Sequence, residues 1–135
     1  MKYMEGKVIK CVKNRYTILT KENIVYNCKL KGVERLKEIE FSNPISVGDN
    51  VDFAVQNENQ EGVINKVFPR KNYVIRQSVN LSYKSQILAS NIDLSFLIIT
   101  LKDPRTSLLF IDRYLITTNA YKIPTILIFN KIDIY

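Results

Sequence analysis

Three side chains near the end of the sequence, Asn130, Lys131 and Asp133, have the types and spacing needed to recognise the edge of a purine. They follow an apolar run, residues 125–129 (TILIF), which is typical of a buried strand in a parallel sheet. A carboxylate at the end of such a strand can accept from the ring N–H and the exocyclic amine of guanine together, whereas adenine lacks this pair of donors. Asn130 can donate to the acceptor edge, and the stem of Lys131 can lie across the base. The sequence therefore predicts a guanine-binding element.

A nucleoside triphosphatase also needs a loop that cradles the phosphates, typically Gly-x-x-x-x-Gly-Lys-Ser/Thr. The one Gly-Lys pair in the sequence is Gly6-Lys7, and Val8 follows it in place of Ser or Thr. Two hypotheses account for the missing cradle. Either the guanine assignment is wrong, or the elements are permuted and the phosphate loop follows residue 135. The second hypothesis also explains why the C-terminal region predicts only part of a sheet.

The elements expected to position this signature form one strand-helix-strand unit. Residues 93–101 (DLSFLIITL) are nearly all apolar, which predicts a strand covered on both faces. Residues 103–106 (DPRT) then end the strand, and Thr106 or Ser107 is the expected N-cap of a helix. Residues 125–129 return as a second, parallel strand. Apolar or small residues recur at helical spacing between the strands: Leu108, Ile111, Leu115 and Thr118.

The first half of the sequence has a different pattern. Residues 7–67 show apolar residues alternating with polar ones in five short stretches, which predicts half-buried strands. Turn-forming residues separate the first three strands, and one longer connection follows the third. This layout is typical of a small Greek-key barrel of the OB type, with an SH3-like barrel as the alternative. The expected organisation is an OB-fold barrel over residues 1–72, a linker over 73–90, and an incomplete α/β (βαβ) domain over 91–135.

Charge is unevenly distributed along the chain. The net charge is +7, and residues 1–37 hold ten Lys or Arg against three acids. Such a basic block favours a polyanionic partner such as RNA, although a solvated protein surface is the simpler interpretation. Arg70, at the end of the expected barrel, and Arg76, in the expected linker, are further RNA candidates. The candidate RNA contacts within the basic block are Lys10, Lys13, Arg15, Lys21, Lys29, Lys31 and Arg35.

Several classes of protein are disfavoured. The sequence has no apolar run long enough to cross a membrane and begins without the apolar stretch of a signal peptide, so a cytoplasmic location is expected. Cys11 and Cys28 are too few for a disulfide scaffold, and the chain has no His for a conventional zinc site. Both cysteines are expected to be ordinary thiols in the core or on the surface.

Several short segments, taken in chain order, resemble one known family across nearly the whole sequence. The family is the ribosome small-subunit-dependent GTPase A family (RsgA, also called YjeQ). The ordered set is more specific than the guanine signature alone. The segments that carry the resemblance are residues 48–49 (GD), 62–64 (GVI), 69–72 (PRKN) with Arg76, 91–93 (NID), 112–115 (DRYL) and 130–133 (NKID).

The resemblance implies an N-terminal OB barrel, a circularly permuted GTPase domain in which the guanine signature precedes the phosphate loop, and a C-terminal zinc-binding domain. It also implies binding to the 30S small ribosomal subunit and its 16S rRNA during subunit maturation, with hydrolysis of GTP to GDP and phosphate in the presence of Mg²⁺. By position, Asn130, Lys131 and Asp133 would be the guanine contacts.

The sequence departs from this pattern because it lacks the phosphate loop, the switch elements and the zinc site. The resemblance therefore implies an N-terminal fragment of such a GTPase, with no catalytic residue and no metal ligand within it. Without a phosphate cradle or Mg²⁺ ligands, the 135-residue chain alone is predicted to be inactive.

Two further hypotheses stay open at the level of sequence. The chain could be a stand-alone OB-type RNA-binding module that hydrolyses no nucleotide. It could also be a structural protein whose exposed half sheet pairs with another chain and causes self-association.

Overall fold

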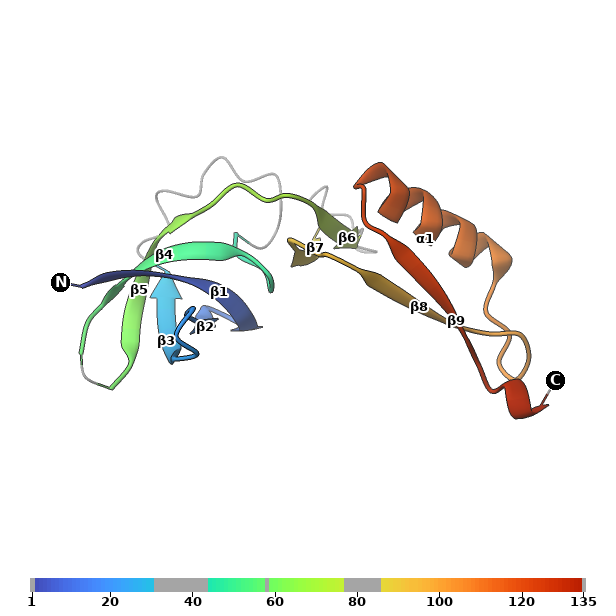
Figure 1. The fold of residues 1–135 in the computed structure, drawn as a ribbon, viewed down its shortest axis with the longest axis horizontal. Coiled ribbons are helices and arrows are strands. Elements are labelled where there is room, and N and C mark those ends of the chain that lie inside the picture. The colour runs from blue at the N-terminus through green and yellow to red at the C-terminus, as the bar shows by residue number, and fades with distance from the viewer. Residues whose placement is uncertain (1, 31–43, 58, 77–85, 135) are drawn as a thin grey trace. The chain divides into compact units, whose positions relative to one another are not determined.

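The computed structural model describes residues 2–30, 44–57, 59–76 and 86–134. The chain divides into two compact units, Met1–Asn91 and Ile92–Tyr135. The first unit contains a barrel and a hairpin, and the second contains two strands and a helix (Figure 1).

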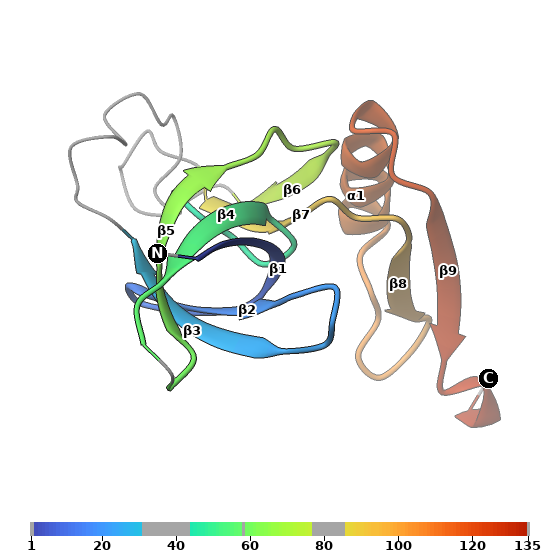
Figure 2. The same ribbon diagram turned by 60° about the vertical axis from the view of Figure 1, so that its left-hand side comes forward.

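Five strands close the barrel of the first unit, as Figure 2 shows. They pair in the order β1-β2-β3-β5-β4, and the pairing of β3 with β5 is parallel while the others are antiparallel. This mixed five-stranded arrangement confirms the barrel of OB type. The strands are β1 (Tyr3–Val12), β2 (Arg15–Leu19), β3 (Val25–Leu30), β4 (Asn50–Val55) and β5 (Glu61–Val67).

Alternation of side chains along these strands builds the barrel core. Val8, Ile18 and Phe53 are fully buried, and the Phe53 ring lies 5.1 Å from that of Tyr26 between centroids. Each large apolar side chain removed from water in this way contributes roughly 1.5–3 kcal/mol. Cys28 also packs in this core. The period of two does not hold throughout β1, because a bulge between Val8 and Lys10 shifts the register, so that Cys11 packs against the core and Val12 is exposed.

Residues with left-handed backbone make the turns between strands. Lys13 turns β1 into β2 with φ 54°, and Asn23 lies in the turn before β3 with φ 60°. Gly48 precedes β4 with φ 94°, and a Cβ atom there would lie 1.9 Å from the Ser90 carbonyl oxygen. The turn before β4 thus has room only for glycine at position 48.

A hairpin occupies both ends of the segment that was expected to be a linker. Strands β6 (Tyr73–Arg76) and β7 (Gln86–Ser90) pair antiparallel, and the Ser90 N–H donates to the Val47 carbonyl oxygen at 2.9 Å. The buried residues of β7, Ile87 and Ser90, are three positions apart, and a bulge interrupts β6 between Val74 and Ile75, so neither strand shows a clear alternation in the sequence. The domain boundaries proposed from the sequence stay a prediction.

The second unit is a parallel βαβ unit of β8 (Ser95–Thr100), α1 (Leu108–Ala120) and β9 (Thr125–Asn130), followed by a short 3-10 turn, η2 (Ile132–Ile134). Leu97 and Ile99 of β8 pack with Ile111 of α1. Ser107 is the N-cap residue of α1, one of the two expected. No helix in the described ranges is long and apolar enough to cross a membrane.

One face of the β8–β9 sheet differs from the expectation. The sequence predicted strands covered on both faces, but α1 covers only one of them in Figure 1. Phe96 and Ile98 alternate with the buried residues of β8 and are 57% and 61% exposed. A continuous apolar run indicates that both faces of a strand can be buried. It does not indicate which element packs on the second face.

Candidate functional site

The carboxyl ends of β8 and β9 lie side by side and carry the candidate guanine contacts. The parallel register places Thr100 opposite Asn130, the last residue of β9. Lys131 follows with a left-handed φ of 58°, and Asp133 lies in η2. The structure therefore brings Asn130, Lys131 and Asp133 together at the edge of a parallel sheet where open α/β folds bind nucleotides.

The loops after the two strands are tied to each other. The Lys131 ammonium donates to the Asp103 carbonyl oxygen with a distance of 2.5 Å between Nζ and O. Within the first loop, the Thr100 N–H donates to Thr106 Oγ1 at 2.9 Å, and the Thr106 N–H donates to the Thr100 carbonyl oxygen at 2.7 Å. These contacts hold Lys131 in place beside Asn130. Sequence reasoning missed Asp103 because its contribution is a backbone atom, for which side-chain type gives no signal.

The basic residues of the barrel fall into two places. Arg15 on β2 lies directly opposite Lys29 on β3, and both are exposed. Lys13 lies in the adjoining β1–β2 turn, and Lys10 is exposed on β1. Like charges placed opposite one another on a sheet lower stability, so this arrangement favours a role in binding. We call Lys10, Lys13, Arg15 and Lys29 the basic face.

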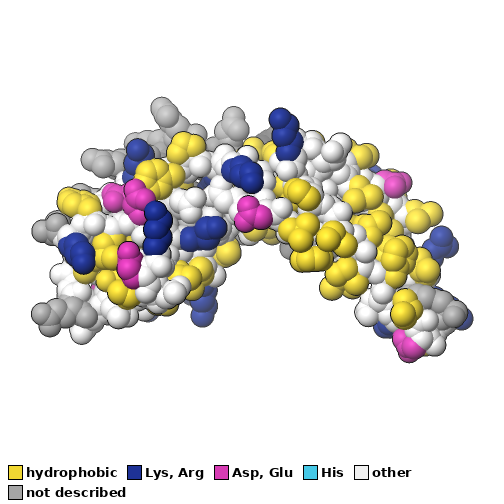
Figure 3. All heavy atoms as spheres, in the orientation of Figure 1, with side chains coloured by type: hydrophobic (Ala, Val, Ile, Leu, Met, Phe, Trp, Pro, Cys, Tyr) yellow, Lys and Arg dark blue, Asp and Glu magenta, His cyan; other side chains and the backbone are white. Residues whose placement is uncertain are grey.

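Lys21 lies apart from the basic face, in the turn at the other end of β2. The candidates Lys31 and Arg35 fall outside the described residues, as does the side chain of Arg76. Figure 3 shows Lys and Arg side chains spread over the visible surface of the barrel, whereas hydrophobic side chains gather on the unit of β8, α1 and β9.

A polar cavity opens beside the basic face. Its volume is about 310 Å³, and Arg15, Asn27, Lys29 and Gln56 are among the residues that line it. Two cations and two amides offer many donors, but Glu61 places a carboxylate in the same wall. Such a mixture suits a polar ligand with both donors and acceptors better than a bare anion.

Asp49 is the most buried ionised group of the barrel. Its carboxylate accepts from Arg70 Nε and Nη2, each at 2.7 Å, from the Ser46 N–H at 2.9 Å and from Ser90 Oγ at 2.5 Å. Burial alone would raise the pKa of Asp49, but the hydrogen bonds from Arg70, Ser90 and Ser46 outweigh it and hold that pKa below its ordinary value. The hydrogen bond to Asp49 in turn raises the pKa of Arg70.

This ion pair gives Arg70 a structural role. Arg70 was one of the residues that the sequence offered to RNA, but its side chain is 16% exposed and also donates to the Pro44 carbonyl oxygen. Asn91 acts beside it, since its amide donates to the Gly48 carbonyl oxygen and accepts from the Lys71 N–H. Arg70 and Asn91 therefore join the hairpin to the barrel.

The two cysteines are free thiols. Cys28 is buried and Cys11 is half-buried. Burial raises the pKa of Cys28 to about 12, and burial together with the nearby charge of Asp49 raises the pKa of Cys11 to about 11. Neither thiol is activated for nucleophilic chemistry. Among the described residues, no three His, Cys, Asp or Glu side chains gather as metal ligands.

Comparison with known proteins covers both units. Residues 5–64 match the family model of the RsgA N-terminal domain, and residues 67–135 match that of the RsgA GTPase. The chain is 46% identical over 134 residues to the small ribosomal subunit biogenesis GTPase RsgA of Christiangramia forsetii, covering 98% of this chain and 42% of the relative. It is 47% identical over 135 residues to the protein of the same name from Flavobacterium psychrophilum, covering 98% and 41%.

Solved structures show the same relationship. YjeQ from Thermotoga maritima is 30% identical, with a TM-score of 0.72 over 99% of this chain and 43% of that one. YloQ, described as a circularly permuted GTPase, is 26% identical, with a TM-score of 0.69 over 99% and 42%. The chain thus spans about two fifths of the length of the relatives it matches. The two family models match residues 5–64 and 67–135 in chain order, so the chain belongs to the RsgA GTPase family.

Proposed function

We propose that this chain is the part of a small-subunit biogenesis GTPase that contacts ribosomal RNA through its barrel and reads guanine at the β8–β9 edge. The observation that carries the proposal is the signature Asn130-Lys131-Ile132-Asp133 at the carboxyl end of a parallel strand, within a chain that matches the family over both units. The working location would be the cytoplasm, where the 30S subunit and its 16S rRNA mature.

The guanine edge offers a donor and acceptor set that suits the base. Asp133 would accept from the ring N–H and the exocyclic amine, and Asn130 would donate to the opposite edge. Lys131 is fixed by the Asp103 carbonyl, so its stem would be held ready to lie along the base. Together these contacts would distinguish guanine from adenine and would position GTP or GDP for the complete enzyme.

Hydrolysis of GTP to GDP and phosphate would belong to the complete protein. Phosphoryl transfer depends on a phosphate cradle and Mg²⁺ that neutralise charge developing on the phosphates, and this sequence has no Gly-x-x-x-x-Gly-Lys-Ser/Thr loop to form the cradle. We expect the 135-residue chain to bind GDP weakly and to hydrolyse no GTP. The zinc-binding domain implied by the family resemblance would likewise be supplied by the complete protein.

The nucleotide part of the proposal can be tested with labelled GDP. A chain extended by a complete GTPase domain should bind GDP, and the Asp133→Asn variant of that chain should lose selectivity for GDP over ADP. Tight GDP binding by the 135-residue chain alone would contradict the argument from the missing cradle. Equal binding of GDP and ADP by the unmodified extended chain would contradict the guanine assignment.

The ribosome part can be tested through the salt dependence of binding to small ribosomal subunits. Each phosphate contact should contribute about 0.7–0.9 to the slope of log K against log salt concentration. Replacing Arg15 and Lys29 by Gln should therefore weaken binding and flatten the slope. The matched control replaces Lys102 and Lys122, exposed cations of the second unit, by Gln. If both pairs of substitutions weaken binding equally, the proposal that the barrel contacts ribosomal RNA is contradicted.

A further inference from the structure

A second cavity lies on the barrel, away from the basic face. Its volume is about 490 Å³, within the range of roughly 300–1,000 Å³ typical of small-ligand sites. It forms where β1 changes partner, because Glu5 and Gly6 pair with β4 while the residues after Lys7 pair with β2. The residues that line it are Glu5, Gly6, Lys7, Leu19, Thr20, Lys21, Asn50 and Phe68.

Gly6 allows the strands to approach at this point. A Cβ atom on Gly6 would lie 2.4 Å from Ile18 Cγ2 and 2.8 Å from the Leu19 carbonyl oxygen. The absence of a side chain therefore permits β1 to lie close against the end of β2, beside the cavity. Any larger residue at position 6 would push these strands apart.

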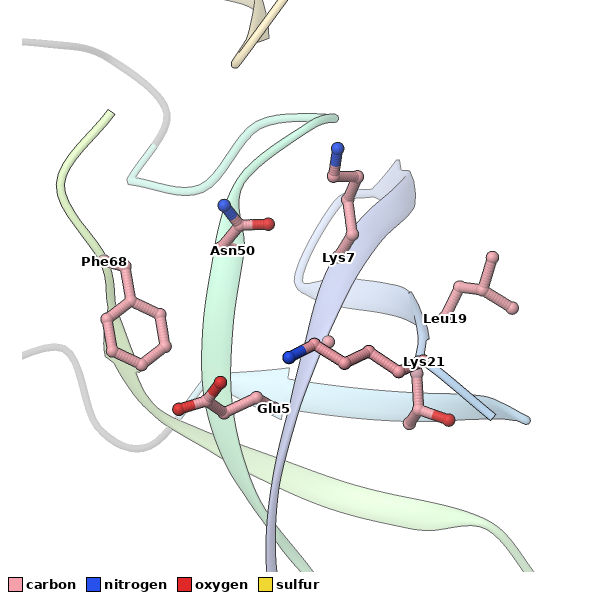
Figure 4. Close-up of a pocket in the computed structure, with 8 residues that line it drawn as sticks. Glu5, Lys7, Leu19, Lys21, Asn50 and Phe68 are labelled. Carbon is pink, nitrogen blue, oxygen red and sulfur yellow. The ribbon is translucent and has the colours of Figure 1, made fainter. Parts of the chain in front are cut away.

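The walls of the cavity are an aromatic ring and an aliphatic side chain. Phe68 and Leu19 lie on opposite sides in Figure 4, and both are half-buried. The Phe68 N–H donates to the Asn50 carbonyl oxygen at 2.9 Å, which fixes the backbone below the ring. The Lys66 ammonium lies 5.4 Å from the centre of the Phe68 ring. A flat ligand could thus stack on a ring whose position is already held.

Polar groups surround this apolar interior. The Lys21 side chain extends its ammonium toward the middle of the cavity in Figure 4, and Lys7 lies at the rim. In the described part of the chain, no carboxylate lies within salt-bridge distance of either ammonium. Glu5 supplies one carboxylate and Asn50 one amide. Two cations around an aromatic wall match a ligand that has both a flat base and a phosphate.

We propose that this cavity binds one unpaired nucleobase of a single-stranded RNA segment, with a preference for bases that carry an exocyclic amine. Phe68 stacks on the base, Lys7 and Lys21 contact the adjoining phosphates, and Glu5 accepts a hydrogen bond from the amine, a contact that uracil cannot make. The inference deepens the proposed contact with ribosomal RNA and rests on it for the source of the strand.

The first experiment measures binding of labelled RNA decamers by fluorescence anisotropy. Oligocytidine should bind more tightly than oligouridine, and a decamer of abasic residues with the same phosphates should bind least. Phe68→Leu should weaken oligocytidine binding about five- to 100-fold and leave the abasic decamer unchanged. Tyr3→Leu removes an exposed aromatic side chain of β1 that does not line the cavity, and it should change none of the three.

The Glu5 contact has its own measurement. Glu5→Ala removes a negative charge, so it should strengthen binding of oligouridine and of the abasic decamer. Oligocytidine should gain less, because it also loses the acceptor for its amine, and the ratio of oligocytidine to oligouridine affinity should therefore fall toward one. An unchanged ratio would remove Glu5 from the proposal.

A second measurement on the unmodified chain covers the case in which Phe68→Leu unfolds. Cytidine 5′-monophosphate should shift the backbone amide NMR signals of Gly6, Thr20 and Asn50, and ribose 5-phosphate should shift them much less. If the cavity amides do not respond to the nucleotide, the cavity proposal is overturned. If the mononucleotide binds as tightly as the decamer, the ligand is a free nucleotide and the RNA assignment is overturned.

The outcomes separate this inference from the proposed function. Salt-sensitive binding to small ribosomal subunits, combined with equal affinity for base-containing and abasic decamers, would overturn the base cavity and leave the ribosome contact standing. Shifts at the cavity amides without any binding to ribosomal subunits would support the base cavity and overturn the proposed ribosome contact.

Discussion

Asp49 shows how one residue decides the arrangement of several segments. Its carboxylate receives donors from the turn before β4, from the segment after β5 and from the end of β7. Taking a carboxylate out of water is costly unless its lone pairs are satisfied, and here the donors come from three separate segments of the first unit. The cluster therefore specifies one position for the hairpin on the barrel.

Replacing Asp49 by Asn should destabilise the first unit by about 2–4 kcal/mol, because Arg70 would lose its counter-ion while still largely buried. Urea denaturation at neutral pH measures this change. Asp112→Asn, at an exposed position of α1, is the matched control and should change the free energy of unfolding by less than about 0.5 kcal/mol. Equal stability of the two variants would mean that the ion pair makes no net contribution to the free energy of unfolding.

Stability should also depend on pH through Asp49. Its pKa is lower in the folded than in the unfolded chain, so the unfolded chain binds more protons in this range. The stabilisation is complete above the unfolded pKa of about 4 and is lost as the pH falls through the folded pKa. Urea midpoints measured from pH 7 to about 3 should fall more steeply for the unmodified chain than for Asp49→Asn. Parallel curves would contradict this assignment.

At the level of single elements, the strands of the barrel could be predicted because inward and outward residues alternate over five or more positions. The turns between the first three strands were predicted from turn-forming residues, but the sequence did not predict that Lys13 has the left-handed backbone in the first of them. The hairpin of β6 and β7 was missed because its stability comes from Asp49, Asn91 and the turn at Gly48. Contacts between segments so far apart leave no local pattern in the sequence.

Gly48 joins two elements and gives a test of that explanation. Gly48→Ala would place a Cβ atom 1.9 Å from the Ser90 carbonyl oxygen at a φ of 94°. We expect a loss of at least about 1–3 kcal/mol from backbone strain, with faster hydrogen exchange at the Ser90 N–H that bonds Val47. Lys13→Gly is the control. Glycine adopts the left-handed backbone at position 13 without strain, so this variant should leave the hydrogen exchange of the Ser90 N–H unchanged. An unchanged Ser90 exchange rate in Gly48→Ala would show that the hairpin is held elsewhere.

For the whole molecule, the sequence predicted the order of fold types and the place of the guanine signature. Asn130, Lys131 and Asp133 were found because strand, signature and sheet edge are contiguous in the chain. The Asp103 carbonyl and the cavity at Gly6 were not found, since a backbone acceptor and the gap between three strands depend on how distant segments meet. Side-chain type therefore located the signature residues at the sheet edge, where guanine binding stays a prediction, and gave no indication of the cavity at Gly6.

The exposed face of the β8–β9 sheet leads to a prediction about the association of whole molecules. Phe96 and Ile98 of β8 are 57% and 61% exposed, and Ile126 and Ile128 of β9, on the same face, are 48% and 38% exposed. Contiguous apolar patches of this kind favour association in water, so the apparent mass of the 135-residue chain should rise with concentration. Ile98→Lys should shift sedimentation toward the monomer, because burying an unpaired ammonium in the contact is costly. Ile116→Lys changes a 68% exposed residue of α1 and should leave association unchanged. A monomer at every concentration would exclude this face as a contact between copies and leave it for another polypeptide segment to cover.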